Sequence, residues 1–258
     1  MKSGNLNDPA ECNGLAHFCE HMCFLGSEKY PEEKTYSEFI TKNGGSKNAA
    51  TGEDYTYYFF DVKNEKFGDA LDIFSQFFKK PRFEESASNR EMNAVDSEFK
   101  KNLSNEERRA IQIEKSILAA EGSALKRFST GNLKSLDVPG VRQYLLEYYQ
   151  NHYSSNLMSL ALVGNYSLDD LENLARENFS DVVNKDLKVA SYEDDPMYGP
   201  DALGHLIKFV PIKELRRLTL KWPQLPPVKD MWDGDPFRYL SYAVGHEGQN
   251  SLLSELIK

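Results

Sequence analysis

The chain has 258 residues, of which 40% are hydrophobic and 12% aromatic. This is enough apolar material for one or two packed domains and excludes a disordered tail. Forty acidic against 31 basic residues give a formal net charge of −9, which repels nucleic acid and anionic membranes, so we expect neither as a ligand.

The chain shows neither the roughly 20-residue apolar run that spans a bilayer nor a signal-peptide pattern. Its cysteines number only three, an odd count that argues against a disulfide framework and favours a reducing compartment. We therefore expect a cytoplasmic protein, with a mitochondrial or peroxisomal form as the alternative.

The first predicted element is a helix around the stretch GLAHFCEH. Apolar side chains recur there at steps of three and four residues, which is the spacing of one buried helical stripe. The stripe consists of Leu15, Phe18, Met22 and Leu25. Gly26 is the expected C-terminal stop.

The segments that follow alternate between helical and extended patterns. Residues 35–45 predict an amphipathic helix capped by Thr35. The aromatic segment 48–62 predicts two strands joined by a turn at Gly52. The remaining predicted elements are a helix at 65–79, one or two long helices at 84–120, a helix at 140–153, a buried strand at 157–164, a helix opened by Ser167 at 167–178, a long loop at 184–204, a strand at 215–223, and helices at 236–244 and 250–258. This alternation predicts an α/β or α+β fold.

Two histidines and a glutamate share one face of the first helix. At 100° per residue, His17, Glu20 and His21 lie together and away from the apolar stripe. Imidazoles at i and i+4 can bind one tetrahedral ion, and the carboxylate can act on a metal-bound water as general base. The pattern H-x-x-E-H is the inverted zinc-peptidase motif. Helical histidines that are merely solvated are the alternative, and zinc needs a third ligand.

The predicted helix at 84–120 offers candidates for that ligand. Glu91 and Glu98 are one heptad apart and lie on the same helical face. Cys19 and Cys23 suggest a rival, structural zinc site, but the helical wheel directs them away from the histidines. We therefore expect free thiols.

Five segments together resemble the insulysin, or insulin-degrading enzyme, branch of the M16 (inverzincin) zinc metallopeptidases. They are GLAHFCEHMCFLGSEKYP, NREMNAVDSE, STGN, NHYSSNLMSLALVG and GHEGQNSLLSEL. The resemblance runs from about Asn7 to Lys258. It implies an α/β (α+β) fold of two related domains, each a mostly antiparallel sheet packed by helices. Residues 1–135 would be the zinc-binding domain and residues 136–258 a partial, inactive domain lining the substrate chamber.

The resemblance also implies the chemistry and the roles of individual residues. His17, His21 and Glu98 would ligate one Zn2+, Glu20 would activate the water, and Glu91 would orient a ligand histidine. The implied activity is zinc-dependent hydrolysis of peptide bonds by an endopeptidase.

Three residues are implied to contact the substrate. Asn48 and Ala49 match the edge strand on which such enzymes bind extended peptides by backbone pairing. An ordinary sheet edge is the alternative reading. Phe24 would line the pocket beside the metal, or would simply pack.

The chain also departs from the family pattern. Arg108 stands where an aromatic residue is usual, and Ala50 replaces a bulkier one, so substrate preference is expected to differ. The chain starts only a few residues before the ligand helix and stops inside the second domain. The alternative function is thus a truncated form that binds zinc or peptide without cleaving. A complementary C-terminal half or a homo-oligomer would be its partner. A non-catalytic structural relative would be expected to have lost the ligands, which are present.

Overall fold

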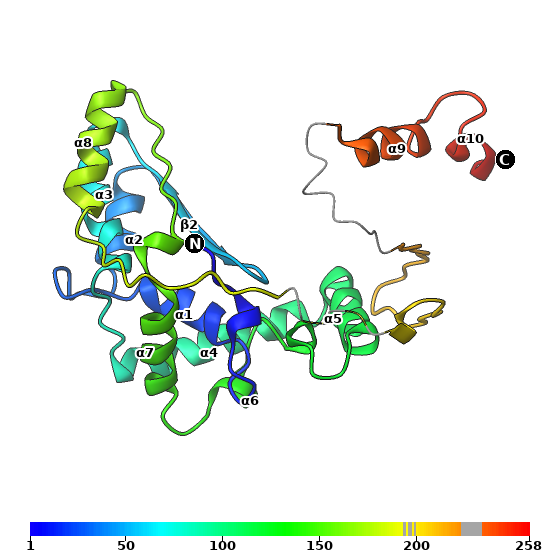
Figure 1. Cartoon of the computed structure of the whole chain (residues 1–258), viewed down its shortest axis with the longest axis horizontal. Helices are drawn as coiled ribbons and strands as arrows, with labels where there is room; N and C mark the ends of the chain where they lie inside the picture. The colour runs from blue at the N-terminus through cyan, green and yellow to red at the C-terminus, as the bar shows by residue number, and fades with distance from the viewer. Residues whose placement is uncertain (193–194, 196–197, 199, 223–233) are drawn as a thin grey trace. The chain divides into compact units, whose positions relative to one another are not determined.

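The computed structural model describes residues 1–192, 195, 198, 200–222 and 234–258 (Figure 1). They form two compact units, Met1–Lys213 and Glu214–Lys258. The α-helices and strands of the first unit are α1 (Leu15–Cys23), α2 (Thr35–Lys42), β1 (Ser46–Thr51), β2 (Thr56–Asp61), α3 (Phe67–Ser75), α4 (Glu85–Asn102), α5 (Glu106–Leu118), α6 (Leu133–Leu136), α7 (Val141–His152) and α8 (Leu168–Phe179). Its short 3-10 helices are η1 (Asn5–Asn7), η2 (Asn64–Lys66), η3 (Gln76–Phe78), η4 (Ala124–Lys126), η5 (Ser155–Leu157) and η6 (Pro200–Ala202). The second unit contains α9 (Pro236–Val244) and α10 (Leu252–Leu256).

Helix α1 is surrounded by other elements of the first unit. It contacts α7, α4 and β1 (Figure 1). Its predicted stripe is confirmed for Leu15, Phe18 and Met22, which are each at most 1% exposed. The helix ends at Cys23, before the predicted stop at Gly26, so Leu25 lies outside it and is half-buried. The Asp8 carboxylate accepts hydrogen bonds of 2.7 Å from the N–H groups of Gly14 and Ala16. These contacts satisfy N–H groups at the start of the helix, which have no partner within it.

The predicted hairpin is confirmed as β1 and β2, an antiparallel pair in register from Ser46 opposite Asp61 to Thr51 opposite Thr56. Alternate side chains of β2 point inward, as the twofold period of a strand requires. There they join an aromatic cluster made of Phe24, Tyr36, Tyr58, Phe60, Phe74, Phe77 and Phe78. Within the described residues, β1 pairs only with β2, so its other edge is free.

The helical predictions in the rest of the chain are confirmed. The segment 84–120 forms α4 and α5, and the segments that begin near residues 140, 167, 236 and 250 form α7, α8, α9 and α10. Ser167 caps α8 as expected, because its hydroxyl accepts from the N–H of Asp170 at 3.1 Å. None of the described helices has the length and apolar composition needed to cross a membrane.

Two predicted strands are wrong. Residues 158–164 are irregular and Val163 is 91% exposed. Residues 215–222 are also irregular, with Trp222 78% exposed, and Pro223 lies outside the described residues. Both segments have the apolar composition of strands, but a strand needs a neighbour for its backbone hydrogen bonds. The described part of the chain offers neither segment one.

The predicted cap of α2 is also wrong. Thr35 is the first residue of the helix, and Lys34 occupies the capping position without a side-chain hydrogen bond. The sequence pattern alone did not distinguish a capping threonine from one already inside the first turn.

Candidate metal centre

Helix α1 brings the two motif histidines into contact. His17 Nε2 and His21 Nε2 are 3.2 Å apart, and the two rings meet edge to face with centroids 4.6 Å apart. This geometry follows from the i, i+4 spacing, which stacks the two side chains one turn apart on one face.

Helix α4 supplies a carboxylate to the same point. Glu98 Oε2 lies 3.7 Å from Nε2 of His17 and 3.7 Å from Nε2 of His21. The three ligand atoms all lie within 4.8 Å of one another. Tetrahedral zinc at its usual bond lengths separates neighbouring ligand atoms by about 3.3 Å, so this donor set fits a zinc ion.

The remaining imidazole nitrogens are held by other parts of the chain. His21 Nδ1 is 2.7 Å from Glu91 Oε1, and His17 Nδ1 is 2.7 Å from the Thr130 carbonyl oxygen. Because both Nδ1–H groups donate to these acceptors, Nε2 is in each histidine the nitrogen that points to the metal site. Glu91 was predicted from the sequence, whereas Thr130 was not. The only sequence signal for Thr130 was the segment STGN, whose role was not predicted.

A close backbone approach brings Thr130 to His17. A Cβ at Gly14 would lie 2.3 Å from the Cα of Gly131, and both glycines have positive φ, 90° and 77°. Only residues without a side chain allow the loop to lie this close to the start of α1.

Burial and neighbouring charges shift the pKa values of both histidines and of Glu98. Burial lowers the pKa of His17, and the adjacent His21 acts in the same direction. Burial also lowers the pKa of His21, but hydrogen bonding to Glu91 and the nearby Glu98 carboxylate outweigh it and raise the pKa to about 9. His21 in turn lowers the pKa of Glu98 to about 2. Two carboxylates thus surround one imidazole, a charge arrangement that suits a divalent cation.

Glu20 lies beside the three ligand atoms but is not one of them. It is only 6% exposed, and burial raises the pKa of its carboxyl. Thr51 Oγ1 on β1 donates to Glu20 Oε2 at 2.6 Å. This hydrogen bond, which was not predicted from the sequence, connects α1 to β1, the strand with the free edge.

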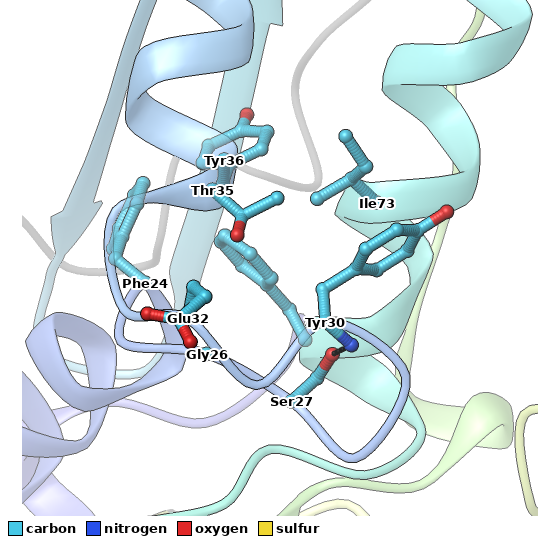
Figure 2. Close-up of a pocket in the computed structure, with 9 residues that line it drawn as sticks. Phe24, Gly26, Ser27, Tyr30, Glu32, Thr35, Tyr36 and Ile73 are labelled. Atoms are coloured by element: carbon cyan, nitrogen blue, oxygen red, sulfur yellow. Dashed lines mark hydrogen bonds between the residues drawn. The ribbon is translucent and has the colours of Figure 1, made fainter.

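The three predicted substrate-contacting residues lie in two places. Asn48 and Ala49 are on β1, with Asn48 exposed and Ala49 half-buried. Phe24 follows α1 and packs against Phe77 with ring centroids 5.0 Å apart. It borders a small pocket of about 10 Å³, which Tyr30 and Tyr36 also line (Figure 2). The substrate roles of these residues stay predictions.

The cysteines are free and buried, as expected. Cys19 is 0% and Cys23 1% exposed. Burial raises the pKa of the Cys19 thiol well above its usual value, so this side chain is a poor nucleophile and a poor metal ligand.

Two family models match the chain. Residues 1–121 match the insulinase (peptidase family M16) model, and residues 141–258 match the peptidase M16 inactive domain. The chain therefore belongs to the M16 peptidase family. The division at residues 135 and 136 stays a prediction.

Curated relatives resemble the chain along nearly its whole length. The insulin-degrading enzyme of Bos taurus is 44% identical over 98% of this chain, which corresponds to 25% of that protein. The A-factor-processing enzyme of Saccharomyces cerevisiae is 41% identical over 99% of the chain and 25% of its own length. A relative from Arabidopsis thaliana, named insulin-degrading enzyme-like 1, peroxisomal, is 42% identical over 98% of the chain and 26% of its own length.

A solved structure shows the same fold. The crystal structure of pitrilysin matches with a TM-score of 0.72 at 32% identity, covering 74% of this chain and 21% of that chain. The chain thus spans about a quarter of the length of the curated relatives it matches.

Proposed function

We propose that the chain carries the catalytic centre of a zinc metalloendopeptidase of the insulysin type, with peptides as substrates. The observation that carries the proposal is the convergence of His17, His21 and Glu98 from two helices, with a buried Glu20 beside them. The M16 family membership supports the same chemistry.

His17, His21 and Glu98 would hold one zinc ion. When bound, zinc supplies Lewis-acid polarisation of the scissile carbonyl and acidifies a water molecule. Glu91 and the Thr130 carbonyl accept from Nδ1 of the two histidines and so direct Nε2 toward the metal site. Because the pKa of His21 is raised to about 9, His21 would release its Nε2 proton when the metal binds. These partners therefore orient the ligands before the metal binds.

Glu20 would transfer the proton from the attacking water to the leaving amine. Burial raises the pKa of this carboxyl toward the range where a general base works near neutral pH. Thr51 holds Oε2, which leaves Oε1 to take a proton from the attacking water. The same carboxyl then passes the proton to the leaving amine, so Glu20 is regenerated at the end of the reaction.

The free edge of β1 would bind the substrate. An extended peptide can pair with the backbone near Asn48 and Ala49, which accepts many sequences because main-chain hydrogen bonds carry much of the affinity. Phe24 would contact a substrate side chain next to the metal. A cytoplasmic location and a complementary half or second copy as partner stay predictions.

The direct test is zinc content of the purified chain together with cleavage of a fluorogenic peptide, with and without a chelator. We expect one zinc per chain and cleavage that stops on chelation and returns with added zinc. Zinc without cleavage would support the non-cleaving alternative, and absence of zinc binding would rule out the metallopeptidase.

Replacing Glu91 by Gln tests the positioning of His21. The amide keeps the size of the side chain but removes the negative charge that faces Nδ1, so we expect zinc affinity to fall roughly 10- to 100-fold. Competition with a chromophoric chelator measures the change. Glu85→Gln, an exposed position on the same helix, is the control. An unchanged affinity in Glu91→Gln would show that the histidine needs no such partner.

A further inference from the structure

Strand β1 carries a lysine on the side that faces α1. Side chains two residues apart on a strand share a face, so Lys47, Ala49 and Thr51 point the same way. Thr51 contacts Glu20 at one end of this row. At the other end, Lys47 Nζ lies 4.7 Å from the ring centre of Phe24, one helical turn beyond Glu20. Lys47 therefore lies on the same face of β1 as Thr51, which contacts the candidate general base Glu20.

The ammonium group of Lys47 has aromatic neighbours but no anion. It also lies 5.9 Å from the ring centre of Tyr36, and no described carboxylate forms an ion pair with it. Two other poorly exposed lysines do have such a partner. Lys79 pairs with Asp181 and Lys115 pairs with Glu53.

This environment destabilises the charged form of Lys47. Lys47 is half-buried, and burial lowers the pKa of its amine. Ring faces compensate part of the lost hydration, but a partly buried charge is best satisfied by an opposite charge. An incoming carboxylate would meet that need.

A second cation lies near the ligand atoms. Arg108 on α5 is exposed and makes no side-chain ion pair within the described residues. Its positive charge helps to lower the pKa values of both His17 and Glu98. Although the chain has a net charge of −9, Arg108 thus adds positive charge near the ligand atoms, on which an acidic peptide side chain could also draw.

We propose that Lys47 selects peptide substrates that carry an acidic side chain near the cleaved bond. The proposal rests on the peptidase function above. A peptide paired with the free edge of β1 would direct alternate side chains toward the face of Lys47 and Thr51. One of these side chains, if it is Asp or Glu, would form an ion pair with Lys47 beside the rings of Phe24 and Tyr36.

The test uses the zinc-loaded chain with Glu20→Gln as background, so that bound peptides are not cleaved. Fluorescent peptides of one sequence carry a single Glu, moved through successive positions, and each has a Gln counterpart. Anisotropy titrations measure the Kd of each peptide for three chains in this background: one with Lys47 unchanged, one with Lys47→Met and one with Lys47→Arg. Lys63→Met is the control, because Lys63 is an exposed lysine at the end of the same hairpin.

With Lys47 present, we expect the peptide that carries Glu at one particular position to bind roughly fivefold to tenfold more tightly than its Gln counterpart. The preference should vanish in Lys47→Met and persist in Lys47→Arg and Lys63→Met, while affinity for the Gln peptides stays the same. Peptides that bind without any Glu preference, or a preference that survives Lys47→Met, would overturn the inference and leave the proposed function intact. Failure of every peptide to bind would overturn both.

Discussion

The Glu20→Gln chain is expected to keep its zinc and to cleave peptides roughly 100- to 10,000-fold more slowly than the wild type. Glu20 is not among the converging ligand atoms, so its replacement leaves His17, His21 and Glu98 in place. Gln fills the same volume, and its amide oxygen can still accept the hydrogen bond from Thr51. What it cannot do is take a proton from water at neutral pH.

Zinc content by mass spectrometry and initial rates on a fluorogenic peptide give the two readouts. Glu11→Gln, an exposed glutamate shortly before α1, controls for the loss of one negative charge. Near-wild-type cleavage by the Glu20→Gln chain would mean that another group is the base. Loss of zinc from that chain would mean that Glu20 is a ligand.

The His21→Ala chain is expected to lose stoichiometric zinc and with it all measurable cleavage. His21 contributes one of the three ligand atoms and contacts both Glu91 and Glu98. Its removal leaves two carboxylates without the imidazole between them, and two ligands do not hold zinc tightly. The helix should survive, because His21 lies away from the buried stripe of α1.

Metal content after dialysis, together with circular dichroism, separates loss of the site from loss of the fold. His205→Ala is the matched control, because His205 is exposed and lies away from the three ligands. Zinc retained at wild-type affinity by His21→Ala would place the metal elsewhere in the chain. Loss of helical signal would show that His21 has a structural role.

Elements with a strong local signal were predictable from the sequence. The apolar stripe of α1 and the spacing of His17 and His21 are properties of consecutive residues, so a helix of 3.6 residues per turn determines both. Glu98 was harder to assign, since only the family resemblance identified it as a ligand. Its position on α4 could be predicted, but its distance from His21 depends on how two helices pack.

The two failed strands show the limit of local patterns. Residues 158–164 and 215–222 have strand-like composition, yet neither pairs with another segment among the described residues. Strand formation depends on a partner that is remote in sequence, whereas helix hydrogen bonds connect residues four apart. The hairpin was predictable because its two strands are neighbours in the sequence.

The sequence by itself determined the ligand types, the helix that presents the histidines and the family. Only the tertiary structure decided which groups support them. The Thr130 carbonyl that holds His17 is 113 residues away in the chain, and the Thr51 hydroxyl that holds Glu20 is 31 away. That Lys47 lies beside Phe24 without a carboxylate partner depends on how β1 packs against α1, so the sequence alone does not show it. Such contacts join residues that are remote in the sequence and meet only through packing, so local periodicity cannot predict them.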